Sequence, residues 1–177
     1  MIIHIVNPKR VRLISALDAE RTRECLFEVN AEVNEFRFGH WYDQEAFMIE
    51  LQANFQPSED LELVQKMAGN VERKNDQSYA DDGISQVAVM TVGAAAKADV
   101  KVPNPVTLVP YRTFQEVGQP ASAFVFRVGD KGEPTFMLQE AQNGLWRNEA
   151  VANIKAYLAQ AVSHMQPNVR DHITIIG

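Results

Sequence analysis

Residues 102–128 read V-P-N-P-V-T-L-V-P-Y-R-T-F-Q-E-V-G-Q-P-A-S-A-F-V-F-R-V. Across 123–128, large apolar side chains alternate with smaller or polar ones, which is the period of a strand with one buried face. Pro110 interrupts the earlier half, and that half is expected at a sheet edge or a bulge because proline lacks the N–H of a central strand. The stretch therefore predicts two strands joined by a polar bend, and it holds no catalytic residue types in a recognised arrangement.

An alternating pattern also occupies residues 24–29. Cys25, Phe27 and Val29 fall on one side of the predicted strand, and glutamates fall on the other. The apolar side is expected to be buried. Cys25 is therefore expected to act as a small buried hydrophobic residue and not as a nucleophile.

Other segments add to the predicted sheet. Residues 1–15 are expected to form a hairpin, and Phe36 and Phe38 are expected to extend or pair with the strand at 24–29. Small residues at 93–98 predict a connector. Further strands are expected at 87–91, 135–139 and 173–176.

Helical spacing replaces strand spacing at 43–69. Apolar residues recur every four positions from Phe47 to Phe55, which predicts a helix with one buried face. Asp43 and Ser58 are the expected N-caps of two successive helices, because their side-chain oxygens can accept from the first free backbone N–H groups.

A last helix is expected at 148–163, with Asn148 as its N-cap. Trp41 and Trp146 are expected to anchor the junctions between helices and sheet. The predicted apolar stripe of this helix comprises Val151, Ile154, Leu158 and either Ala161 or Val162.

These elements predict an α+β fold. A largely antiparallel β-sheet carries the helix pair at about 43–69 and the C-terminal helix at about 148–163. The chain of 177 residues is expected to form a single domain over 1–177, in which the hairpin at 1–15 is the one segment that could stand apart. A chain of this length buries roughly 70% of its unfolded surface.

Composition argues against a disordered chain, a nucleic-acid-binding protein and a membrane protein. Hydrophobic residues make up 46% and charged residues 23% of the chain, values of an ordinary globular protein. The formal charge of −6 disfavours nucleic acid as a partner without excluding a local basic strip. Cys25 is the single cysteine, so no internal disulfide forms, and a reducing cytoplasm is the expected location. No stretch approaches the ~20 apolar residues of a membrane helix, and no membrane partner is expected.

Neither a cofactor nor a metal site is expected. The four histidines lie scattered without metal-ligand spacing, and phosphate-binding glycine loops are missing from the sequence. Asp81 and Asp82 could hold a divalent ion, but they precede Gly83, where aspartate is favoured for turn geometry alone. Asp130 and Glu140 are weakly similar to the paired carboxylates that hold the metal ion in a metal-dependent nuclease.

One stretch combines aromatic rings with guanidinium groups. Tyr111, Arg112, Phe114 and Arg127 are candidate binding residues, because exposed rings and arginines together can stack single-stranded bases. The simpler interpretation, in which alternating aromatic residues such as Phe124 belong to the core, is favoured.

Four segments of the chain carry a resemblance to a known family. They are F-M-I-E-L-Q-A-N-F (47–55), D-D-G-I-S-Q (81–86), the proline-framed strand pair at 103–127 and L-W-R-N-E-A-V-A-N-I-K-A-Y-L (145–158). They resemble the YfdQ-like family of uncharacterised phage and prophage proteins, over most of the chain from about Phe36 onward, and the chain is similar to the C-terminal part of such proteins. Relatives often carry an acidic turn before the tryptophan where this sequence has Gln142, Asn143 and Gly144. That family has no agreed activity, so the resemblance implies no catalytic residue. It does imply a bacteriophage or prophage context and the cytoplasm of a bacterial host.

The sequence therefore favours a non-enzymatic phage accessory protein that acts through protein–protein contacts or homo-oligomerisation. Edge strands marked by proline, which could pair with another subunit, support this expectation. The first alternative is a single-stranded nucleic-acid accessory factor of phage DNA metabolism. The second alternative is a metal-dependent nuclease built on Asp130 and Glu140.

Overall fold

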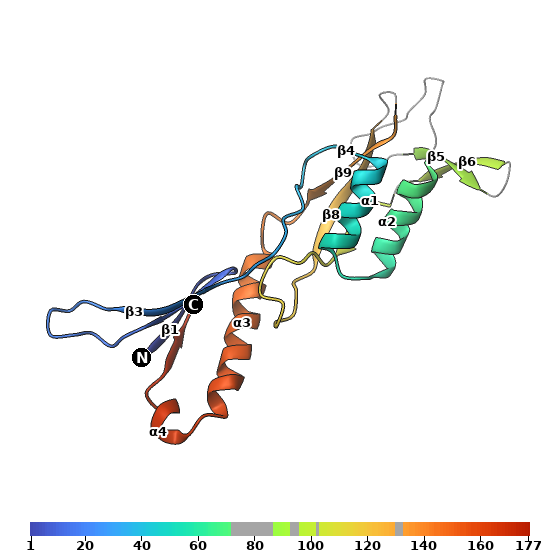
Figure 1. The fold of residues 1–177 in the computed structure, drawn as a ribbon. Coiled ribbons are helices and arrows are strands. Elements are labelled where there is room, and N and C mark those ends of the chain that lie inside the picture. Colours follow the sequence, from blue (N-terminus) through green and yellow to red (C-terminus); the bar gives the residue numbers. More distant parts are fainter. Residues whose placement is uncertain (72–86, 93–95, 102, 130–132) are drawn as a thin grey trace. The chain divides into compact units, whose positions relative to one another are not determined.

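The protein has an α+β architecture, as the sequence predicts (Figure 1). The computed structural model contains antiparallel strand pairs and helices. The strands within 87–101 are described by their backbone alone. The structure describes residues 1–71, 87–92, 96–101, 103–129 and 133–177.

Segments that are far apart in the sequence gather into two compact units. Unit 1 combines residues 1–34, 111–120 and 145–177. Unit 2 combines residues 35–110 and 121–144. The chain therefore passes between the units four times. That the whole chain folds as one domain stays a prediction.

The sheet of unit 1 has the strand order β10-β1-β2-β3 in the described part of the chain. Antiparallel pairing of β1 with β2 confirms the hairpin predicted at the N-terminus, and β10 joins β1 in parallel. The hairpin of β2 and β3 extends away from helix α3 (Trp146–Ser163) (Figure 1). The four strands are β1 (Ile2–Asn7), β2 (Arg10–Ile14), β3 (Cys25–Asn30) and β10 (Thr174–Ile176).

The helices of unit 1 are α3 (Trp146–Ser163) and the short α4 (Pro167–Arg170). Helix α3 begins two residues before the prediction, at a Leu145 N-cap without a side-chain hydrogen bond, so the proposed Asn148 cap is wrong. Ala150, Ile154 and Val162 are its buried residues. Since α3 contacts β1 and β10, these side chains cover one side of the sheet.

The sheet of unit 2 has the order β4-β9-β8-β7 among the described residues. Val106 lies opposite Phe124, which confirms that the stretch at 102–128 contains an antiparallel strand pair. Strand β7 lies at the edge, and Pro110 beyond it bridges to Phe55, so the expected edge position is confirmed. The strands are β4 (Tyr42–Asp43), β7 (Val106–Leu108), β8 (Ser122–Gly129) and β9 (Thr135–Glu140).

Two capped helices lie on this second sheet. They are α1 (Gln44–Asn54) and α2 (Glu59–Asn70), which confirms the predicted pair. The Asp43 carboxylate accepts from the Ala46 N–H at 2.8 Å, and the Ser58 hydroxyl accepts from the Leu61 N–H at 3.1 Å. Both caps stand where the sequence predicts them.

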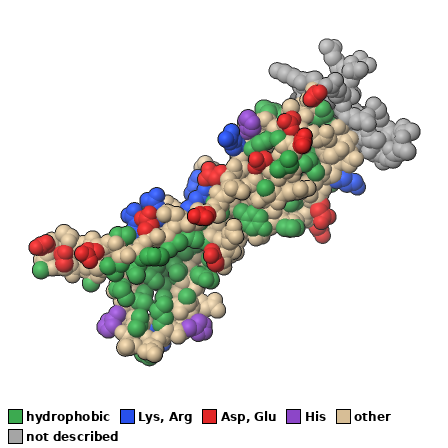
Figure 2. Space-filling view, in the orientation of Figure 1, with side chains coloured by type: hydrophobic (Ala, Val, Ile, Leu, Met, Phe, Trp, Pro, Cys, Tyr) green, Lys and Arg blue, Asp and Glu red, His purple; other side chains and the backbone are tan. Residues whose placement is uncertain are grey.

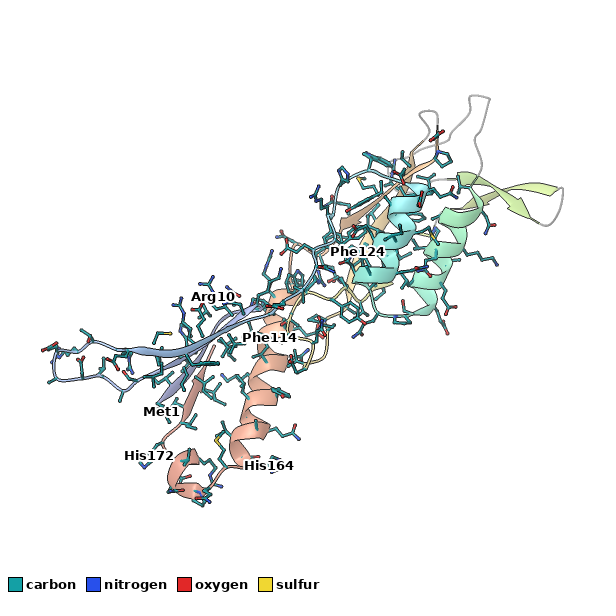
Figure 3. The ribbon with its side chains drawn as sticks, viewed as in Figure 1. Met1, Arg10, Phe114, Phe124, His164 and His172 are labelled. Carbon is teal, nitrogen blue, oxygen red and sulfur yellow. The ribbon has the colours of Figure 1, made fainter. Side chains whose placement is uncertain are left out.

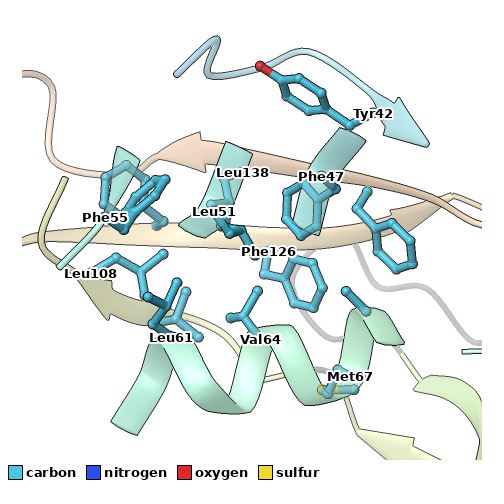
Figure 4. Packing of buried hydrophobic residues seen from close by; sticks show 14 of the residues in the cluster. Tyr42, Phe47, Leu51, Phe55, Leu61, Val64, Met67, Leu108, Phe126 and Leu138 are labelled. Atoms are coloured by element: carbon cyan, nitrogen blue, oxygen red, sulfur yellow. The ribbon is translucent and has the colours of Figure 1, made fainter. Parts of the chain in front are cut away.

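The hydrophobic core of unit 2 lies between this helix pair and this sheet (Figure 4). Phe47, Phe126 and Phe136 are fully buried and stack with nearly parallel rings. Phe36 joins this cluster and Phe38 packs against it, so the expectation that they extend the strand at 24–29 is wrong. Aromatic burial outweighed strand continuation.

Two further expectations need correction. The helices cover two different sheets instead of one, because α3 contacts the strands of unit 1. The connector expected at 93–98 is also wrong in part. Antiparallel β5 (Val87–Val92) and β6 (Ala96–Lys101) pair in unit 2, and residues 96–98 belong to the second strand, whereas 93–95 lie outside the described residues.

Candidate functional site

The most exposed apolar part of unit 1 is the outer strand of its sheet. All six residues of β3 are exposed, including Leu26 at 49%, Phe27 at 63% and Val29 at 39%. These values correct the expectation that Cys25, Phe27 and Val29 are buried. The alternation identified the strand correctly, but it could not tell whether another element covers its apolar face.

The position of α3 explains this exposure. Ile5 on β1 is only 3% exposed, in a strand that α3 contacts. Val11 and Leu13 on β2 are half-buried, and Phe27 on β3 lies in the open. The register places these side chains on one face of the sheet, because Ile5 lies opposite Val11 and Leu13 lies opposite Phe27. The exposed fraction of the apolar side chains on this face therefore rises from β1 to β2 to β3.

Apolar surface gathers more generally on unit 1. Figure 2 shows hydrophobic side chains below the β2–β3 hairpin, toward α4. Ten of the thirteen large hydrophobic residues that are exposed in the described part of the chain belong to unit 1. These are Met1, Leu17, Leu26, Phe27, Val29, Leu145, Tyr157, Met165, Val169 and Ile176.

Unit 1 buries few apolar side chains. Among the described residues, the buried hydrophobic residues of unit 1 are Ile5, Ala150, Ile154 and Val162, whereas the cluster in unit 2 holds seventeen. Unit 1 therefore has a small core for its 77 residues and leaves much of its apolar surface exposed.

A β-bulge changes the direction of one side chain on β3. The register pairs Leu13 with Phe27 but Ile14 with Cys25, so Leu26 is the extra residue. Because neighbouring residues of β2 point to opposite faces, Cys25 shares a face with Ile14 and not with Phe27. The predicted face of Cys25, Phe27 and Val29 is wrong for this reason as well.

The one charged side chain within β3 is neutralised inside the same hairpin. The Arg12 Nε donates to the Glu28 carboxylate at 2.5 Å, and Arg10 Nε lies 3.9 Å from the other oxygen. The hydrogen bond from Arg12 lowers the pKa of Glu28, with a smaller contribution from Asn30, and Glu28 in turn raises the pKa of Arg12. Glu28 therefore stays ionised and paired near neutral pH.

Net charge differs sharply between the two units. Unit 1 carries nine Lys and Arg against eight Asp and Glu, a formal charge of +1. Unit 2 carries eight against fifteen, a formal charge of −7. Because unit 1 is nearly neutral, electrostatic repulsion between the unit 1 surfaces of two copies is small, although the whole chain carries a charge of −6.

The sequence-predicted binding residues divide between the units. Tyr111, Arg112 and Phe114 lie in a loop of unit 1, and Arg127 lies on β8 of unit 2. Phe114 lies in the loop against α3, where the Asn153 amide donates to the Gly118 carbonyl at 2.9 Å (Figure 3).

Arg112 has a packing role within unit 1. It is only 7% exposed, and its guanidinium lies 4.3 Å from the centre of the Trp146 ring. It also donates to the Pro120 carbonyl at 3.3 Å. The helix junction expected at Trp146 thus includes a cation–π contact with Arg112. Trp41 is 45% exposed, so it does not anchor a junction as a buried residue.

Aromatic residues of β8 belong to the core of unit 2. Phe124 and Phe126 are fully buried, which confirms the core interpretation for these two side chains. Arg127 is half-buried between buried neighbours and points to the other face of the strand. Phe114 and Tyr111 are also half-buried.

The metal candidates of the sequence are only partly described. Asp81, Asp82 and Asp130 lie outside the described residues, and Glu140 ends β9. In the part of the chain that the structure describes, no group of three or more His, Cys, Asp or Glu residues is placed to hold a metal ion. His164 and His172 lie on either side of α4 (Figure 3), and His40 packs edge-on against Tyr42.

Comparisons with protein-family models, curated proteins and solved structures find no match. The resemblance to the YfdQ-like family stays a prediction. Within the described residues, no helix has the length and apolar character needed to cross a membrane.

Proposed function

We propose that this protein is a non-enzymatic protein that acts by binding a second copy of itself through the exposed apolar surface of unit 1. The observation that carries the proposal is strand β3, where Leu26, Phe27 and Val29 are exposed together at the edge of the sheet. An edge strand with exposed apolar side chains is a common place for subunits to join.

The magnitudes support this proposal. Burying a Phe or Leu side chain contributes about 1.5–3 kcal/mol, so Phe27 and Leu26 from two copies supply several such increments. Association costs roughly 4–15 kcal/mol of translational and rotational freedom, which additional apolar residues of unit 1 help to offset. The nearly neutral charge of unit 1 keeps electrostatic repulsion small.

A phage or prophage accessory role in the bacterial cytoplasm is the biological setting of this proposal. It rests on the resemblance of the four sequence segments alone. The single-stranded nucleic-acid alternative stays a prediction, and the packing of Arg112 against Trp146 counts against that arginine as a binding group. The nuclease alternative also stays a prediction.

The first prediction tests self-association with one exposed side chain. Phe27→Glu introduces a charge into the apolar surface, and we expect it to weaken association at least tenfold. Light scattering of the unchanged protein over a range of concentrations should give masses above that of the 19.9 kDa chain. Phe27→Glu should shift the distribution toward one chain.

Ile49→Glu is the matched control for this experiment. Ile49 is 58% exposed on α1 of unit 2, close to the 63% of Phe27, but it lies outside unit 1. This variant should retain the mass of the unchanged protein, and circular dichroism should show that both variants are folded. A mass of one chain for the unchanged protein at every concentration would refute the proposed function.

A further inference from the structure

Strand β3 directs part of its backbone away from its own sheet. The Ala31 N–H donates to the Lys9 carbonyl at 2.8 Å, and Arg10 lies opposite Asn30. Hydrogen-bonded and non-hydrogen-bonded pairs alternate in antiparallel sheets. Phe27 and Val29 therefore turn their backbone groups toward β2, whereas Glu28 and Asn30 turn theirs outward.

This outward side, which we call the β3 edge, has few of the features that normally protect an edge strand. Cys25–Asn30 contains no proline and no lysine, and its one charge is already paired with Arg12. Among the described strands, β4, β7 and β10 also lie at sheet edges but have two or three residues each, and Pro110 follows β7 closely. Strands β5 and β6 have six residues each and are both edges of their two-stranded sheet, and β6 carries Lys97 and Lys101. The β3 edge is twice as long as β7 or β10 and has regular geometry beyond its bulge.

We infer that the partner at the β3 edge is the β3 edge of a second copy, joined antiparallel about a twofold axis so that one sheet continues through both copies. This inference rests on the proposed self-association and specifies its geometry. An antiparallel pair of identical strands is self-complementary, because each contact occurs twice across the axis. The sequence of β3 therefore supplies both halves of the interface.

The direction of the backbone selects a register. An axis through Glu28 places the outward groups of Glu28 opposite those of its copy and pairs Leu26 with Asn30. Phe27 then lies opposite Val29 of the second copy at a non-hydrogen-bonded position, where side chains approach most closely. Aromatic and β-branched residues in such pairs stabilise sheets, and this pair forms twice.

The same register brings two Glu28 residues together. Like charges opposite each other normally destabilise a sheet. Here each carboxylate already accepts from Arg12 of its own hairpin, with Arg10 nearby, so each hairpin brings a neutralised or positive local charge to the axis. The paired arginines therefore make a Glu28–Glu28 approach acceptable.

Cys25 allows the geometry to be measured without a new label site. It is exposed and is the only cysteine, so a nitroxide can be attached to it alone. In the proposed register the two Cys25 residues are offset by six positions, which separates them by roughly 20 Å at 3.4 Å per residue. Pulsed electron-spin resonance should give a single distance near this value, and light scattering should show that the labelled protein still associates.

Asn30→Pro tests the outward hydrogen bonds directly. The Asn30 N–H faces away from β2, so proline removes a donor from the interface and leaves the ladder to β2 intact. We expect it to weaken association at least tenfold, whereas Asn30→Ala, which keeps the N–H, should change the dissociation constant less than threefold. Hydrogen exchange at the amides of Glu28 and Asn30 should slow as protein concentration rises.

The outcomes separate this inference from the proposed function. A 20 Å distance together with the loss of association in Asn30→Pro supports the β3 pairing. Continued association of Asn30→Pro, together with fast exchange at Glu28 and Asn30 in the associated unchanged protein, refutes the β3 pairing and leaves self-association through the apolar face in place. A chain that is monomeric throughout refutes both.

Discussion

The planar shape of the Arg112 guanidinium, as well as its charge, determines the contacts that this side chain makes. Its guanidinium stacks on Trp146 and donates to the Pro120 carbonyl, and the side chain is almost fully buried. The flat guanidinium can satisfy both contacts at once, and a lysine ammonium cannot. Arg112 therefore joins the 111–120 loop to α3 within unit 1.

Replacing this arginine should destabilise the protein. We expect Arg112→Lys to lower the free energy of unfolding by about 1–2 kcal/mol, because it loses the stacked geometry and a hydrogen bond. Chemical denaturation followed by tryptophan fluorescence measures the change. Arg147→Lys is the control, since Arg147 lies farther from the same ring, at 5.3 Å, and is exposed.

The same pair of variants also examines the nucleic-acid alternative. If Arg112→Lys were as stable as the unchanged protein but bound single-stranded DNA more weakly at low salt, Arg112 would be a binding residue, and its packing role would be contradicted. Salt dependence of that binding would identify the phosphate contribution.

The bulge of β3 shows what residue patterns omit. Alternation over 24–29 predicted the strand, but an inserted residue shifts the alternation without a signature in composition. Leu26 was the available signal, because it places an apolar residue on the side predicted to be polar. The contact of Arg112 with Trp146 was not predictable, since it joins residues 34 positions apart.

Helix α2 illustrates how local signals predict an element. Ser58 accepts a hydrogen bond from the Leu61 N–H, and acidic residues occupy the first turn, where they complement the helix dipole. Leu61, Val64, Met67 and Ala68 face the core. All of these features lie within a few residues of one another, so the sequence alone sufficed.

Removal of this cap should weaken the second unit. Ser58→Ala is expected to lower the free energy of unfolding by about 1 kcal/mol, because the Leu61 N–H loses its partner. Thermal unfolding followed by circular dichroism is a suitable measurement. Ser163→Ala makes the same chemical change at the exposed end of α3, where the hydroxyl donates to the Gln160 carbonyl, and should have a smaller effect. Equal effects of the two variants would contradict the capping role.

Strand β6, in contrast to α2, is an element that local signals do not predict. Its sequence, A-K-A-D-V-K, is dominated by residues with low strand propensity, so a connector was the reasonable prediction for its beginning. Pairing with β5 overrides this propensity. Strand pairing depends on a partner, which a local pattern does not contain.

At the scale of the whole molecule, the two units differ in the apolar surface that they bury. The cluster of unit 2 holds aromatic rings from α1, its strands and the segment at 35–41, whereas unit 1 buries few large side chains in the described part of the chain. Buried apolar area is the main source of folding free energy. Unit 1 should therefore depend more on association.

This difference predicts two classes of amide protection. On dilution, hydrogen exchange should speed up in β1, β2 and α3 as copies separate, because unit 1 loses its partner. Exchange in α1, α2 and β8 should change little with concentration. Mass spectrometry of peptides from both units gives the comparison, and a uniform response along the chain would contradict it.

The sequence predicted the fold class and most strands, but it did not predict how they divide between sheets. Alternation at Phe27 and at Phe126 indicates a buried face in both cases, yet one residue is 63% exposed and the other is fully buried. Hydrophobic pattern reports local periodicity and not the partner that covers it. Phe36 follows β3 closely in sequence and still packs in the cluster of unit 2.

The path of the backbone has a practical consequence. Unit 1 is built from the beginning, a middle loop and the end of the sequence. Trimming from either terminus removes strands or α3 from unit 1 before it shortens unit 2, so truncation cannot isolate unit 1. Obtaining it alone requires a rewired gene in which short linkers replace residues 35–110 and 121–144.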